Sequence, residues 1–121
     1  MSHDLDPPGE ELARRLLGSV PYRDRLPAGR LRPPVGMLRG DVRGLHEVHL
    51  LLAPDLQSLP AINLGKLADW IGRVVGDAEL ADRLRALTRA AKHYVEACLA
   101  AYELIGHRLA QARQVAGGEV R

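Results

Sequence analysis

The sequence predicts an all-α fold, in which short helices pack on a long C-terminal helix and an extended Pro/Arg-rich N-terminal arm precedes them. Between residues 77 and 115, apolar residues recur every three or four positions, which is the period of an α-helix. Phe is absent and the chain has only one Trp and three Tyr, so Leu, Val, Ile and Ala must build the core, a composition that favours helices. No stretch of useful length alternates as a strand would.

Residues 1–40 divide into a short helix and an arm. Residues 10–18 begin with two glutamates and end at Gly18, the charge pattern and stop signal typical of a helix. Residues 21–36 contain four prolines and four arginines. Prolines at this density remove helix donors and favour extended backbone, so we expect an extended arm here. A helical domain at 41–116 and a frayed tail at 117–121 complete the expected organisation.

Three further helices follow, each with a polar cap. Asp41 is placed to cap a helix over 42–53, Asn63 to cap one over 64–75, and Asp77 to cap the last. Pro54 and Gly76 are placed to end the first two. The last segment contains no Pro, and we favour one helix of about 37 residues and about 55 Å over two helices broken near residues 88–91.

A helix of this length predicts that the chain self-associates. The two preceding helices are each about 18 Å long and cannot cover its whole apolar stripe. A second copy is the simplest cover, because most soluble oligomers are symmetric homo-oligomers. The alternative is a compact monomer whose arm folds back over the stripe. The residues predicted to form the oligomer interface are Leu87, Tyr94, Cys98, Tyr102, Ile105 and Leu109.

Composition points to the cytoplasm. The single cysteine, Cys98, allows no intramolecular disulfide, and its place on the apolar stripe indicates a buried, inert thiol. The N-terminus is acidic and proline-containing, unlike a signal peptide. No apolar run approaches the roughly 20 residues that span a bilayer. The glycines fit no nucleotide-binding fingerprint, and the sequence predicts neither a catalytic residue nor a cofactor.

One cluster on the last helix suggests a metal site. His93, Glu96, Glu103 and His107 lie on one stripe, where facing helices of a bundle enzyme could share a metal ion. Their spacing departs from that of carboxylate-bridged bundles, and a solvated face with Glu and His pairs is the favoured interpretation. A second pair, His46 and His49, is best explained by a partly buried histidine at position 49.

The arm is the better functional feature. Eight arginines lie between residues 14 and 43 against two acids, whereas basic and acidic residues balance from residue 44 onward. Guanidinium groups bind carboxylates and phosphates bidentately. We predict a non-catalytic helical scaffold or accessory subunit that self-associates and docks a larger, acidic protein partner. Nucleic-acid binding and a strap packed on its own domain are the alternatives. The predicted docking residues are Arg23, Arg25, Arg30 and Arg32.

A resemblance adds to this picture. Residues 63–84 resemble a segment of a small uncharacterised bacterial and archaeal helical domain. The shared features are a Trp-Ile helix, a Gly-Asp turn and a Leu-Ala continuation. The matching residues are Trp70, Ile71, Gly76, Asp77, Leu80 and Ala81. The resemblance implies helical structure and no particular activity.

Overall fold

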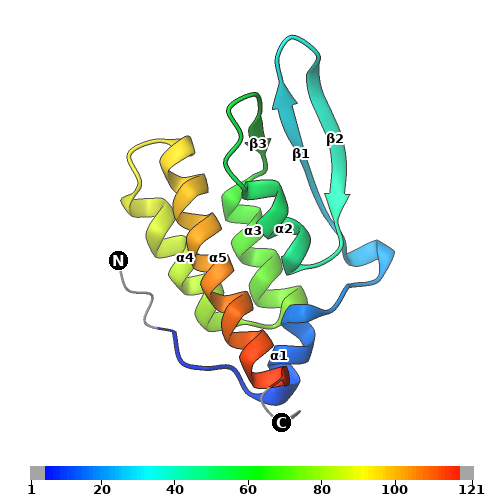
Figure 1. Cartoon of the computed structure of the whole chain (residues 1–121), viewed down its shortest axis with the longest axis vertical. Helices are drawn as coiled ribbons and strands as arrows, with labels where there is room; N and C mark the ends of the chain where they lie inside the picture. The colour runs from blue at the N-terminus through cyan, green and yellow to red at the C-terminus, as the bar shows by residue number, and fades with distance from the viewer. Residues whose placement is uncertain (1–4, 118–121) are drawn as a thin grey trace.

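A computed structural model describes residues 5–117 and shows a helical body with a small sheet at one side (Figure 1). The helices are α1 (Glu10–Leu17), α2 (Leu45–Leu52), α3 (Leu64–Trp70), α4 (Ala78–Ala90) and α5 (Tyr94–Gly117). A 3-10 turn, Tyr22–Asp24, precedes the sheet, and a π-helical turn, Ile71–Val75, extends α3. The tail predicted to fray lies, apart from Gly117, outside the described residues.

The predicted all-α class is wrong, because the proline-rich arm folds into a β-hairpin. Strands β1 (Leu26–Arg32) and β2 (Gly36–Val42) pair antiparallel, from Leu26 opposite Val42 to Arg32 opposite Gly36. Strand β3 (Leu59–Ala61) pairs with the other edge of β1, which gives the order β2-β1-β3. The prolines suit these places: Pro33 and Pro34 form the turn, and Pro60 lies in a short edge strand where a missing N–H is tolerated.

The preferred single helix over 77–115 is also wrong, and the chain reverses direction after Ala90. Ala91 adopts an extended backbone, with φ −71° and ψ 145°, and α5 then packs along α4 (Figure 1). His93 and Glu96 mark the new start. The Nδ1 atom of His93 accepts a hydrogen bond from the Glu96 N–H at 3.2 Å, and the Glu96 carboxylate accepts one from the Lys92 N–H at 3.4 Å. The reversal lets one chain cover its own apolar stripe.

Other helix signals are confirmed. The Asn63 side chain accepts the Lys66 N–H at 2.9 Å and the Asp77 side chain accepts the Leu80 N–H at 3.0 Å, as N-caps do. Gly76 ends the π-helical turn with φ +88°, a left-handed conformation that favours glycine. Asp41 caps no helix, because β2 extends to Val42 and α2 begins only at Leu45.

Helix α5 occupies the centre of the helical body and packs against α1, α2 and α4. Leu104, Ile105 and Leu109 on α5 are fully buried in a core that extends into all three neighbours. The first turns of α5 lie at the same end of the molecule as the hairpin tip and the segment before β3 (Figure 1). The fold thereby brings three distant parts of the sequence to one end.

Candidate functional site

Exposed hydrophobic side chains gather at this end of the molecule. Of the eleven large hydrophobic residues exposed among residues 5–117, nine lie in the hairpin, in residues 56–59 or in the first turns of α5. Two adjoining hollows, of about 460 and 160 Å³, share Leu56 and Leu59 and connect these segments. We name the exposed hydrophobic residues that line them the apical surface: Val35, Leu56, Leu59, Tyr94, Val95 and Leu99.

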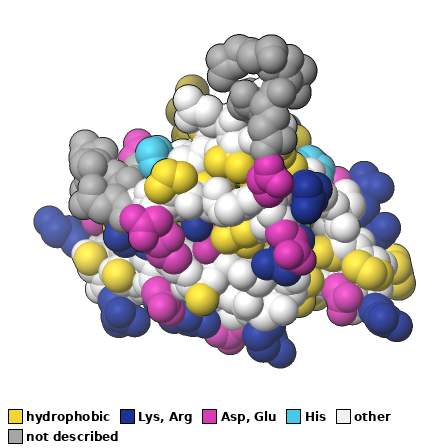
Figure 2. Space-filling model, turned by 90° about the horizontal axis from the view of Figure 1, so that it is seen from below, with side chains coloured by type: hydrophobic (Ala, Val, Ile, Leu, Met, Phe, Trp, Pro, Cys, Tyr) yellow, Lys and Arg dark blue, Asp and Glu magenta, His cyan; other side chains and the backbone are white. Residues whose placement is uncertain are grey.

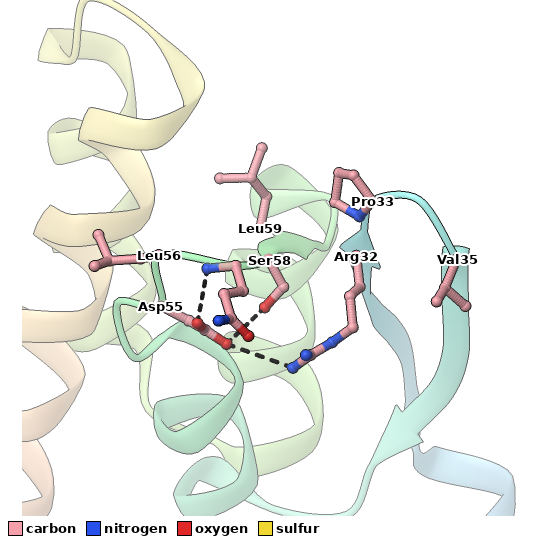
Figure 3. A pocket seen from close by; sticks show the side chains of 8 residues that line it. Arg32, Pro33, Val35, Asp55, Leu56, Ser58 and Leu59 are labelled. Atoms are coloured by element: carbon pink, nitrogen blue, oxygen red, sulfur yellow. Dashed lines mark hydrogen bonds and ion pairs between the residues drawn. The ribbon is translucent and has the colours of Figure 1, made fainter.

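Asp55 fixes the loop that presents Leu56. Its carboxylate accepts the Gln57 N–H at 2.9 Å and the Ser58 hydroxyl at 2.8 Å (Figure 3). These hydrogen bonds, together with the nearby guanidinium groups of Arg32 and Arg30, hold the pKa of Asp55 below its usual value. The loop is therefore braced, while the Leu56 side chain at its tip is fully exposed and gains nothing from burial in its own fold.

Two arginines tie the hairpin to this loop. Arg30 donates to the Ser58 hydroxyl at 2.7 Å, to the Ser58 carbonyl at 3.3 Å and to the Leu51 carbonyl. Arg32 lies 3.6 Å from the Asp55 carboxylate at the rim of the larger hollow, as Figure 3 shows. Val35 and Leu56 are consequently held on opposite sides of that hollow.

Tyr94 fixes the part of the apical surface that α5 contributes. Its hydroxyl lies within hydrogen-bond distance of the carbonyls of Pro60 and Ile62, at 2.8 and 2.9 Å, and accepts the Ile62 N–H at 3.0 Å. Burial of the phenol group raises the pKa of Tyr94 to about 12. The hydroxyl is thus a fixed donor, yet 41 % of the residue remains exposed beside Val95 and Leu99.

Positive charge accompanies the apical surface. Residues 30–38, 54–60 and 89–96, which form this end, contain four Lys or Arg against two Asp or Glu, a net charge of +2. The remainder of the chain therefore has 13 basic against 13 acidic residues. The opposite end carries acidic and basic side chains intermixed, with small separate hydrophobic patches (Figure 2). Excess charge and exposed apolar area thus coincide at one end.

The four predicted docking arginines lie in different places. Arg30 and Arg32 brace the apical end. Arg25, at the base of the hairpin, lies 3.9 Å from Asp41 and 4.9 Å from the Tyr22 ring centre. Arg23 is exposed in the 3-10 turn beside it. The structure therefore divides the four arginines between the two ends of β1.

The six residues predicted to form an oligomer interface mostly face inward. Cys98, Ile105 and Leu109 are buried within the single chain, and burial raises the pKa of the Cys98 thiol. Leu87 and Tyr102 pack against the core, and Tyr94 alone among the six is exposed. Because α4 and α5 fold against each other, the uncovered stripe on which this interface depended is not formed. Self-association stays a prediction without that basis.

The candidate metal ligands are not brought together. His93 and Glu96 cap α5, Glu103 is exposed further along it, and His107 lies one turn beyond. Within residues 5–117, no three His, Cys, Asp or Glu side chains group closely enough to hold a metal ion. His49 is half-buried, and its ring stacks on Tyr102 with centroids 4.4 Å apart. The described geometry gives the metal hypothesis no support.

The sequence interpretation missed the loop that organises the apical surface. Asp55 and Ser58 are three residues apart, a spacing at which an Asp side chain can hold a turn through backbone and hydroxyl donors, with Leu56 between them. This local signal was available. The partners Arg30 and Arg32 lie more than twenty residues earlier, and no local pattern connects them to the loop.

Comparison with protein-family models, with curated proteins and with solved structures finds no match to this chain. The resemblance of residues 63–84 to an uncharacterised domain therefore stays a prediction. In the part of the chain that is described, no helix has the length and apolarity needed to cross a membrane. The function has to rest on the geometry of the molecule itself.

Proposed function

We propose that this chain is a non-catalytic accessory or scaffold subunit that docks a larger protein through the apical surface. The observation that carries the proposal is Leu56, a fully exposed leucine held on a loop that Asp55, Arg30 and Arg32 brace. An exposed apolar patch around two hollows is typical of a protein-binding surface. A braced loop also loses little conformational entropy when a partner binds.

The positive charge of this end indicates the kind of protein that would bind there. The net charge of +2 around the apolar side chains complements a protein segment that carries apolar anchors flanked by aspartate or glutamate. Arg32, whose side chain is 41 % exposed, lies at the rim of the larger hollow and can meet such a carboxylate. This retains the predicted acidic partner but reduces the contribution of Arg23 and Arg25, which lie at the base of the hairpin.

Site-specific photo-crosslinking tests the proposal. A photoreactive phenylalanine derivative is placed at position 56, and separately at position 50, where Leu50 is 71 % exposed on α2 outside the apical surface. In the native host, we expect a protein adduct from position 56 whose yield falls with added salt, and none from position 50. The crosslinked peptide should combine apolar and acidic residues.

Three results would contradict the proposal. They are equal adducts from both positions, no protein adduct from position 56, and an adduct at position 56 that nuclease removes. The last would favour the nucleic-acid alternative. A variant with Leu56→Asp should lose the adduct of a probe at position 99, whereas Leu50→Asp should retain it.

A further inference from the structure

The two edges of the sheet differ in a way that points to a binding surface. Strand β3 is three residues long and contains Pro60, two features by which proteins protect an exposed edge from pairing. Strand β2 is seven residues long, contains no proline, and pairs with β1 in an unbroken register without a bulge. Its outer edge adjoins no other strand of the described chain. Strand β2 is therefore the longer and more regular of the two edges, and it ends at Val42, beyond which the Arg43 carbonyl accepts the Val20 N–H at 2.7 Å.

The side chains of β2 fall on two faces. Leu38 and Gly40 share the face of Arg30, which reaches the loop and α2. Arg39 and Asp41 share the opposite, outer face with Gly29 and Pro27, their partners on β1. The side chain of Arg39 is exposed and makes no hydrogen bond or ion pair with any residue from 5 to 117, whereas the Asp41 carboxylate lies 3.9 Å from Arg25. The edge thus presents a cation and an anion two residues apart on one face.

We infer that β2 pairs antiparallel with β2 of a second copy of this chain, about a two-fold axis at Gly40. Charge selects this register. An axis at Arg39 would place Arg39 opposite its own copy, and an axis at Asp41 would place Asp41 opposite its own copy. An axis at Leu38 would place neither Arg39 nor Asp41 opposite a residue of opposite charge. The axis at Gly40 alone places Arg39 opposite the partner's Asp41, and does so twice by symmetry.

The other face supports the same register. Leu38, 47 % exposed, comes to lie opposite the partner's Val42, and this contact forms twice. Val42 is buried against its own core, so Leu38 extends that core across the new sheet. Gly40 meets the partner's Gly40 at the axis, where backbones can approach closely. Six strands then form one continuous sheet, and the two hairpin tips point in opposite directions. The pair would present two apical surfaces at its two ends.

Charge swapping tests the register. Sedimentation of the wild-type chain over a hundredfold concentration range should reveal a species of twice the 13.2 kDa chain mass. Arg39→Asp alone, and Asp41→Arg alone, each create two like-charge pairs and should raise the dimer dissociation constant by about tenfold. An equimolar mixture of the two single variants should dimerise again, because the two carboxylates of one chain then face the two guanidinium groups of the other.

The double variant R39D/D41R exchanges the charges within one chain and should dimerise more tightly than either single variant, although it also replaces the ion pair of Arg25 and Asp41 by two like charges. Registers centred at Arg39 or Asp41 already place like charges opposite each other, so neither single variant would weaken a dimer of that kind, and loss in both single variants identifies the axis at Gly40. Gly40→Cys should form a symmetric disulfide under mild oxidation, since an added Cβ would meet only the Ala28 carbonyl, at 3.7 Å. Gly9→Cys, outside the sheet and equally open, is the matched control. A wild-type chain that stays at 13.2 kDa would overturn the inference. It would also be overturned if dimerisation returned neither in the mixture of the two single variants nor in the double variant.

Discussion

At the scale of single residues, the ion pair of Arg108 and Asp77 is buried. Arg108 is 1 % exposed, and its guanidinium donates to both oxygens of Asp77, at 2.7 and 3.2 Å. It also reaches the Asp6 carbonyl at 2.6 Å and the Gln111 side chain at 2.8 Å. Because Asp77 caps α4, one arginine on α5 fixes the start of α4 and the N-terminal segment together.

Removing this arginine should destabilise the fold strongly. Arg108→Ala leaves the Asp77 carboxylate buried without its counter-ion, and we expect the free energy of unfolding to fall by about 3 kcal/mol. Urea denaturation followed by circular dichroism measures the change. Arg113→Ala, an exposed position on the same helix, is the control and should change the unfolding free energy by less than about 0.5 kcal/mol. Equal effects would contradict the role assigned to Arg108.

His49 should make stability depend on pH. Burial first, and the charge of Arg113 second, lower the pKa of His49 from 6.5. The folded state therefore prefers the neutral ring, so its stabilising effect is complete above pH 6.5 and is lost as the pH falls from 6.5 through the lowered pKa. Urea midpoints measured between about pH 7.5 and 5.5 should decrease in the wild type and decrease less in His49→Gln. An unchanged slope in the variant would assign the dependence to other groups.

At the scale of elements, the hairpin and the loop before β3 form one braced unit. The hydrogen bonds that hold the loop converge on Asp55 and Ser58, and Arg30 and Arg32 connect them to β1. The unit owes its shape to polar contacts, since most of its large hydrophobic residues face solvent.

Removing the Asp55 carboxylate should free this loop without unfolding the protein. In Asp55→Ala, amide hydrogen exchange at residues 56–58 should accelerate, because the Gln57 N–H loses its acceptor. Exchange in α5 should not change. Asp82→Ala, which removes an exposed carboxylate bonded to Arg85 on α4, is the control and should leave residues 56–58 unaffected. Slow exchange retained in the first variant would show that other contacts hold the loop.

At the scale of the whole molecule, α1, α2, α4 and α5 share one core. We therefore expect a single cooperative unfolding transition. Trp70, the only tryptophan, is 4 % exposed and donates to the Asp24 carbonyl at 2.7 Å, so its fluorescence reports on contact between α3 and the segment before the hairpin. Its urea transition should coincide with the loss of helical circular dichroism. Two separated transitions would show that the hairpin side and the helical body unfold independently.

Sequence by itself determined the parts of this protein that depend on neighbouring residues. The caps at Asn63 and Asp77 and the end at Gly76 were predictable because each needs only a few adjacent residues. Tertiary structure alone decided the hairpin and the reversal after Ala90. Both faces of β2 are largely exposed, so its sequence shows no alternation of apolar and polar residues. Over residues 77–115 the helical period likewise shows only which face of the helix is apolar. Where the chain turns so that this face is covered depends on contacts with segments distant in the sequence.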